Sequence, residues 1–211
     1  MTDVLLCGTG WSSPLTFFSH EQCQNLGLPY PRNDEEPKHK DHWDLLEAAA
    51  DARVLASFPM LGNPPALYER HSTSTPYRLY KNMVPLPSDD IEDDHSIVFI
   101  GQLLIANYFM AAQCQAMWAT AYMDRKLTLP SKEEQEKEVA LFTAWCKRRY
   151  LNTGEDGHNL TFETLGYTDD LLKHMGLKSH RKGWFKDLFA PVMGRNFEGV
   201  KGEYIKKYGV D

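Results

Sequence analysis

The sequence lacks the signals that would place it in several large classes of protein. Its four cysteines are widely spaced and form no paired motif, so a disulfide framework is not indicated. Acidic residues outnumber basic ones by 29 to 23, and the net charge of −6 argues against a nucleic-acid-binding protein, which needs a basic face. The N-terminus has no basic region followed by an apolar core and a small-residue cleavage site, so we expect a cytoplasmic protein.

Motifs for nucleotide binding and for nucleophilic catalysis are also missing. Gly8-Thr9-Gly10 follows an apolar run at 4–7, but Ser13 stands where the dinucleotide-binding fingerprint requires Gly or Ala. The sequence contains neither a P-loop nor a Gly-x-Ser-x-Gly nucleophile elbow. We therefore expect no independent nucleotide site, and a hydrolase has no positive support.

Two pairs of side chains could begin a metal site, His20 with Cys23 and His39 with His42. Neither pair has a second pair at a spacing typical of zinc sites, and both lie in polar stretches of sequence. We expect these side chains to be solvated and the protein to bind no metal ion.

The order of apolar, polar and turn residues predicts two strands and four helices. The strands, at 4–7 and 95–100, are continuously apolar in the manner of buried parallel strands. Helices are expected at 44–58, 102–123, 131–149 and 168–176, and the first would bury Leu45 and Leu55. We therefore predict an α+β fold that is mostly helical and contains a small parallel sheet.

The stretch Gln102–Met123 contains no charged residue and is long enough to span a bilayer. It also carries amide side chains at a density that is costly in hydrocarbon, so we expect a helix buried in protein and no membrane contact. Buried amides need partners. They either form structural hydrogen bonds to neighbouring backbone or line a pocket that has a few polar groups in an apolar wall.

Four segments carry a resemblance to a known family: Asp3–Trp11 followed by Phe17-Phe18, Tyr77–Pro85, Ser96–Gln102 and Leu129–Glu134. The first is similar to the turn that leads the chain of flavin-containing monooxygenases from the NADPH domain back to the FAD domain. The third is similar to the last strand of their FAD domain. The chain most resembles the C-terminal part of the fungal members that act in secondary metabolism.

The resemblance implies a division into residues 1–150, a truncated remnant of the FAD domain, and residues 151–211, a helical extension packed on it. In the family the FAD and NADPH fingerprints lie upstream of the Thr-Gly-Trp motif, so the resemblance implies a chain that holds no cofactor of its own. Residues that lie near the flavin in a full-length relative would then be vestigial here. By the resemblance these residues are Gly8, Thr9, Gly10, Gly101 and Gln102.

Our first functional hypothesis is a cofactor-independent enzyme of natural-product biosynthesis that cyclises or rearranges an apolar intermediate, for example by a pericyclic (Diels–Alderase-type) step. Such a step needs shape, exclusion of water and one or two hydrogen-bond donors. The candidate donors are Gln102, Asn107, Gln113 and Gln115. The candidate substrate-binding wall is Trp11, Tyr108, Trp118 and Tyr122.

The alternative hypothesis is the non-catalytic C-terminal half of a split or truncated flavin-dependent monooxygenase, which acts only with an FAD- and NADPH-binding partner chain. A third is a truncated reading frame with no function of its own. Because a truncated sheet leaves an open edge, we expect it to pair, most simply in a homodimer.

Overall fold

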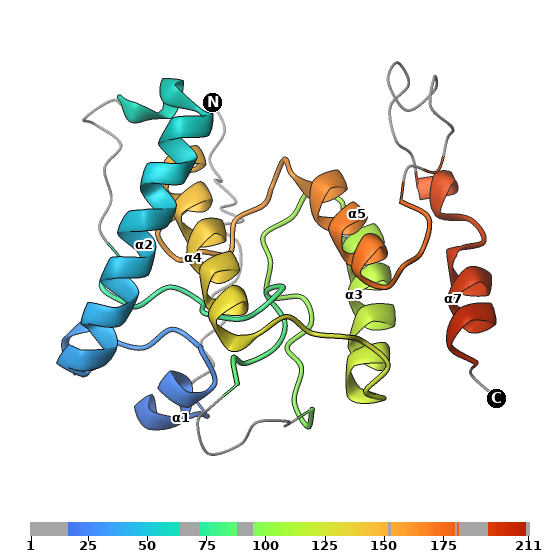
Figure 1. Cartoon of the computed structure of the whole chain (residues 1–211), viewed down its shortest axis with the longest axis horizontal. Helices are drawn as coiled ribbons and strands as arrows, with labels where there is room; N and C mark the ends of the chain where they lie inside the picture. The colour runs from blue at the N-terminus through green and yellow to red at the C-terminus, as the bar shows by residue number, and fades with distance from the viewer. Residues whose placement is uncertain are drawn as a thin grey trace, which may run out of the picture.

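The computed structural model of the chain describes residues 17–63, 72–87, 95–151, 153–179, 181 and 194–209, and the regular structure within them is helical (Figure 1). The α-helices are α1 (His20–Asn25), α2 (Pro37–Ser57), α3 (Tyr108–Met123), α4 (Lys132–Arg149), α5 (Thr164–His174) and α7 (Val200–Tyr208). Short 3-10 helices lie at Arg32–Asp34, Pro59–Gly62 and Gly194–Phe197.

The helices form two packed pairs with a further helix at one end. α2 packs along α4, α3 packs along α5, and α7 packs on α3. In Figure 1 the α2/α4 pair lies to the left, the α3/α5 pair to the right of centre and α7 at the far right. The non-helical stretch 72–87 runs between the two pairs and contributes side chains to the core of the α3/α5 pair.

The α2/α4 pair is held together by small apolar side chains and by ion pairs along its edge. α4 begins at a capping box in which Ser131 Oγ accepts from the Glu134 amide and the Glu134 carboxylate accepts from the Ser131 amide, which confirms the predicted start. Arg148 on α4 donates from Nε and Nη2 to the two carboxylate oxygens of Asp51 on α2, at 2.6 Å each. The apolar cluster between the helices is Trp43, Ala50, Val54, Val139, Ala140 and Ala144.

The uncharged helix α3 lies at the centre of the largest apolar cluster. One side of it packs on α5 and α7, with Cys114 and Trp118 completely buried. The absence of charge on this side of the helix therefore reflects burial against protein. No helix among the described residues combines the length and the apolar character that a bilayer span requires.

The prediction of a small parallel sheet is wrong for the part that can be tested, because the described residues form isolated bridges and no strand. The predicted strand 4–7 lies outside the described residues. The predicted strand 95–100 is an extended segment whose Phe99 amide donates to the Met83 carbonyl at 2.7 Å. Its neighbour is a tight turn in which Lys81 and Asn82 have positive φ, and a turn offers no ladder of backbone groups for a strand to join.

Three helix starts also differ from the prediction, and one of them is that of α5, which begins at Thr164 and not at Thr168. α2 begins at Pro37, because proline fits the first turn of a helix, where its missing N–H is not needed. The longer helix buries Trp43 and Val54 and leaves Leu45, which we expected to be buried, 74 % exposed. α3 begins at Tyr108 and not at Gln102.

Candidate functional site

The predicted site residues fall into three groups in the structure. Gly8, Thr9, Gly10 and Trp11 lie outside the described residues. A second group is buried in or beside the core around α3. A third group is exposed at the N-terminal end of α3.

Gln115 belongs to the buried group, and both ends of its amide are used in structural hydrogen bonds. Its Oε1 accepts from the Gly101 amide at 3.2 Å, and its Nε2 donates to the Tyr167 hydroxyl on α5 at 2.9 Å. That hydroxyl in turn donates to the Lys81 carbonyl at 2.9 Å, and burial raises the pKa of Tyr167. The chain of bonds ties α3, α5 and two loops together.

Gly101 stands at a position that only glycine can occupy without displacing a neighbour. Its φ is +81°, and a Cβ atom placed there would lie 2.5 Å from the Tyr108 hydroxyl oxygen. The side chain of the next residue, Gln102, accepts a hydrogen bond at its Oε1 atom from the Tyr77 hydroxyl, at 3.4 Å. Glycine at 101 therefore lets the chain turn tightly into the segment that leads to α3.

Trp118 and Tyr122 form part of a stack of rings in the core. Their rings lie nearly parallel with centroids 5.4 Å apart, and the His95 ring stacks on Tyr122 with a centroid distance of 4.1 Å. Trp118 Nε1 donates to His174 Nδ1 at 3.1 Å, which leaves His174 Nε2 to donate to the Thr128 carbonyl at 3.1 Å. Both predicted wall residues are thus packed in the interior, and Trp118 holds α5 against α3 through its bond to His174.

The exposed group comprises Asn107, Tyr108 and Gln113 at the start of α3. The Ala106 amide donates to the Thr161 carbonyl, so the start of α3 lies beside the loop that leads into α5. Exposed apolar side chains gather on these two neighbouring segments, and Phe109 is 88 % exposed. We call these residues the α3 apolar surface: Leu104, Tyr108, Phe109, Phe162 and Leu165.

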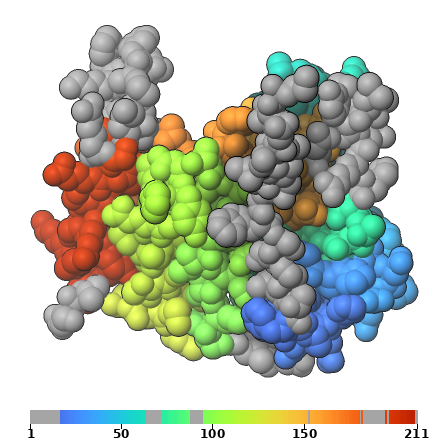
Figure 2. Space-filling model, turned by 180° about the vertical axis from the view of Figure 1, so that it is seen from behind, coloured from blue at the N-terminus to red at the C-terminus, as the bar shows by residue number. Residues whose placement is uncertain are grey.

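The surface of α3 is open on one face of the molecule. In Figure 2 residues 100–123, in green and yellow-green, form a broad exposed area of that face. The exposed side of α3 carries no charged residue. Its residues recur at helical spacing, and they are Phe109, Gln113, Ala116, Thr120 and Met123. Uncharged exposed surface of this extent is typical of a protein interaction site.

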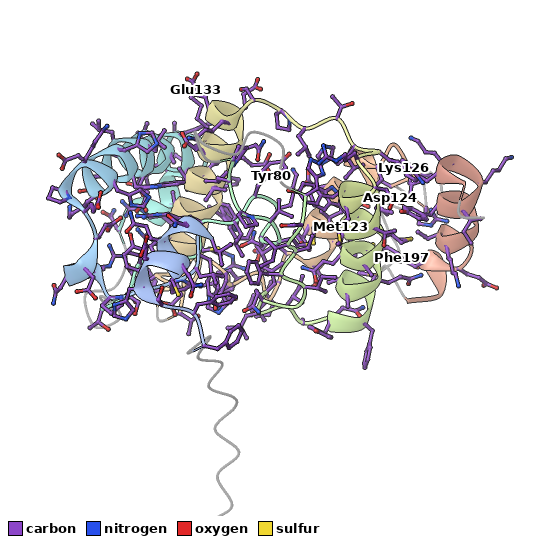
Figure 3. The ribbon with its side chains drawn as sticks, turned by 90° about the horizontal axis from the view of Figure 1, so that it is seen from below. Tyr80, Met123, Asp124, Lys126, Glu133 and Phe197 are labelled. Carbon is purple, nitrogen blue, oxygen red and sulfur yellow. The ribbon has the colours of Figure 1, made fainter. Side chains whose placement is uncertain are left out.

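Sequence reasoning missed Lys81, which joins the two helix pairs. Its ammonium group contacts Glu138 on α4 at 2.6 Å and Asp170 on α5 at 2.8 Å, and its side chain is only 7 % exposed. Although burial opposes the charge, the two carboxylates raise the pKa of Lys81. The preceding residue, Tyr80, lies buried between α4 and α3 (Figure 3), where burial raises its pKa to about 12.

A cavity of about 560 Å³ lies away from α3, where α1 and the first turns of α2 and α4 meet Arg78. His39 and His42 line it together with the ring of Trp43, but no predicted donor or wall residue does. No cluster of metal-ligating side chains occurs within the described ranges. The contact of Arg78 with Glu35 spans 43 positions, so no local pattern could have indicated it.

Comparisons with known proteins identify relatives among fungal FAD-dependent monooxygenases. The chain is 33 % identical over 180 residues to an FAD-dependent monooxygenase of Pyrenophora dematioidea, a match to 85 % of this chain and 32 % of that protein. It is 31 % identical over 212 aligned positions to the FAD-dependent monooxygenase rstn6 of Aspergillus nomiae, covering 99 % of this chain and 36 % of that one. It is 31 % identical to the FAD-dependent monooxygenase DEP4 of Fusarium langsethiae, and this match covers 96 % of this chain and 35 % of that protein.

No family model matches the chain. No solved structure matches it either. The chain spans about a third of the length of the curated relatives it matches. These alignments confirm the resemblance found in the sequence: the chain corresponds to the C-terminal part of FAD-dependent monooxygenases.

Proposed function

We propose that this chain forms the helical C-terminal part of an FAD-dependent monooxygenase and acts together with FAD- and NADPH-binding segments of the kind found in such enzymes. The observation that carries the proposal is the pattern of coverage, because nearly the whole chain aligns with about a third of each relative. The fingerprints for the two dinucleotides do not occur in the 211 residues.

The α3 apolar surface supports a role in docking. Phe109 and Phe162 project from neighbouring segments with most of their surface exposed, and water around such rings is released when a second surface covers them. Gly101 and Gln102, which the family resemblance puts near the flavin, immediately precede this surface in the chain. A flavin-binding segment that docks here would gain apolar contacts and exclude water from the neighbourhood of its cofactor.

A chimera tests this proposal. The part of the Pyrenophora dematioidea monooxygenase that aligns with this chain is replaced by this chain, and the purified product is compared with the same enzyme cut off at the junction. We expect the chimera to hold FAD, visible as flavin absorbance, and to consume NADPH faster than the cut-off enzyme. A chimera that is folded and monodisperse but colourless, beside a yellow parent enzyme, would contradict the proposal.

The second candidate is a cofactor-independent cyclase of natural-product biosynthesis, which would act on an apolar small molecule by a cyclisation, rearrangement or pericyclic step. It is favoured by the exposure of Asn107, Tyr108 and Gln113, because amide donors and an aromatic ring at one end of α3 can reach a ligand. In this case the isolated chain would convert a polyene substrate without FAD. Turnover that survives Asn107→Leu and Gln113→Leu together would argue against these donors.

The homodimer expected from the sequence is a competing way to cover the α3 apolar surface. Sedimentation velocity on the isolated chain measures it directly. A dimer that Phe109→Asp converts to a monomer would assign the surface to a second copy of this chain. A monomer at all concentrations leaves the surface for the flavin-binding part.

A further inference from the structure

The cavity beside α2 is lined by a buried cation that has a nitrogen without a hydrogen-bond partner. Arg78 is 5 % exposed and lines the cavity, and its guanidinium lies over the Trp43 ring with 4.6 Å between the central carbon and the ring centroid. Nη1 donates to Glu35 Oε1 at 2.6 Å. Nε, which is buried as well, has no hydrogen-bond partner.

The unused side of this guanidinium is the edge that arginine normally presents to a carboxylate. Arg148 provides the comparison within the same chain, because its Nε and Nη2 donate side by side to the two oxygens of Asp51. Such paired, charge-assisted bonds are the preferred geometry for carboxylate recognition. A buried N–H without a partner costs stability, so Arg78 presents an edge that a ligand oxygen would satisfy.

The neighbouring histidine does not compete for this edge. Trp43 Nε1 donates to His39 Nε2 at 3.3 Å, so His39 must carry its proton on Nδ1, which lies 3.1 Å from Glu35 Oε1. Burial and the charge of Arg78 lower the pKa of His39, although Glu35 raises it. His39 is therefore a neutral donor to Glu35. Its Nδ1 also lies 3.2 Å from Nη1 of Arg78, and the buried Nε of Arg78 has no hydrogen-bond partner.

The basic and acidic side chains at the cavity balance one another, so a ligand of low charge fits it better than a highly charged one. Lys38 and Lys132 line it with Arg78, Glu36 and Glu136 supply opposite charges, and Glu35 is already paired with Arg78. The remaining lining is partly apolar, from Trp43, Leu86 and Pro87. A doubly charged phosphate would meet two carboxylates here, whereas one carboxylate with an apolar body matches one free guanidinium edge and an apolar wall.

We propose that this cavity binds a small carboxylic acid. Its carboxylate accepts hydrogen bonds from the Nε edge of Arg78, and its apolar part lies against Trp43, Leu86 and Pro87. The site is separate from the α3 apolar surface, and it does not depend on the function proposed above.

Calorimetric titration of the isolated chain with phenylacetate and with its uncharged analogue phenylacetamide tests the site. We expect phenylacetate to bind about tenfold or more tightly than the amide, the range expected for charge-assisted hydrogen bonds. Arg78→Lys keeps the charge but removes the paired edge, and should abolish this preference. Equal binding of acid and amide, or no binding of either, would overturn the proposal.

Two further variants keep the test decisive if Arg78→Lys fails to fold. Lys38→Glu reverses an exposed charge at the cavity and should weaken phenylacetate binding several-fold without changing binding of the amide. Arg148→Lys alters a paired arginine outside the cavity and should leave both affinities unchanged. Phenylacetate binding that is insensitive to Lys38→Glu would contradict a carboxylate site at this position.

Discussion

At the scale of single residues, the amides of α3 divide by their position on the helix. Gln113 and Gln115 are two positions apart, so they point to nearly opposite sides of the helix, and one is exposed while the other is buried. Burial alone decides which amide must find its partners inside the protein. The same residue type therefore holds the core together at one position and meets solvent at the other.

This difference gives a matched pair of substitutions. We expect Gln115→Leu to lower the free energy of unfolding by about 1–3 kcal/mol, because the Gly101 amide loses its acceptor and the Tyr167 hydroxyl loses a donor. Gln113→Leu, on the exposed side of the same helix, should change it by less than about 0.5 kcal/mol. Urea denaturation measures both, and equal effects would contradict the structural role of Gln115.

Tyr80 makes the stability of the chain depend on pH in the alkaline range. Burial raises its pKa from 10.0 to about 12, although the adjacent Lys81 charge acts in the opposite direction. The folded protein therefore holds this proton more tightly than the unfolded chain does, and its contribution is complete below pH 10 and lost as the pH rises towards 12.

We accordingly expect the free energy of unfolding to fall over this pH interval, and to fall less steeply in Tyr80→Phe. Denaturation curves collected at a series of alkaline pH values measure the two slopes. Identical slopes for the wild-type protein and the variant would show that Tyr80 does not titrate in this way.

At the scale of elements, the parts that sequence predicts well are those whose cause lies within a few residues. The start of α4 follows from Ser131 and Glu134, which are three positions apart. The start of α3 depends on a distant partner, because Ala106 bonds to Thr161 and so leaves residues 102–107 outside the helix. Local patterning contains no information about such a bond.

The candidate sites, too, could be predicted from the sequence only where their cause lies within a few residues. The uncharged run 102–123 indicated a buried helix, but α3 is buried on one side only, and no spacing could show which of its amides would be buried or exposed. The cavity at Arg78 depends on contacts with Glu35 and His39 across 39 to 43 positions. The predicted sheet was wrong for a related reason: apolar residues at 95–100 indicate burial but do not provide a neighbouring strand.

Lys81 is the element-scale link between the helix pairs. We expect Lys81→Met to lower the free energy of unfolding by about 1–2 kcal/mol, since Glu138 and Asp170 lose a buried partner but are exposed enough to become hydrated. Lys137→Met, which removes an exposed pair with Glu133 four positions earlier, should have a much smaller effect, because both side chains are already hydrated in the folded protein. Thermal denaturation of both variants makes the comparison, and a smaller effect at Lys81 would rule out the link.

At the scale of the whole molecule, the two ends of the structure differ in what they expose. The α2/α4 end carries ion pairs such as Arg148 with Asp51 and exposes apolar side chains singly, such as Leu45, whereas the α3/α5 end presents the α3 apolar surface. The chain aligns with only a third of its relatives, and the function proposed above has the remainder of such an enzyme contact this second surface.

That reasoning predicts a selective effect of charge on the α3 apolar surface. In the chimera, Phe109→Asp should reduce FAD retention and NADPH consumption, because an aspartate at the contact would be desolvated without a partner. Met60, which is 86 % exposed in the 3-10 helix after α2, provides the control, and Met60→Asp should leave both quantities unchanged. Neither substitution should alter the melting temperature of the isolated chain, since both side chains already face solvent. Equal losses from the two variants would mean that any exposed charge disturbs the enzyme, and no loss from Phe109→Asp would remove the α3 apolar surface from the contact.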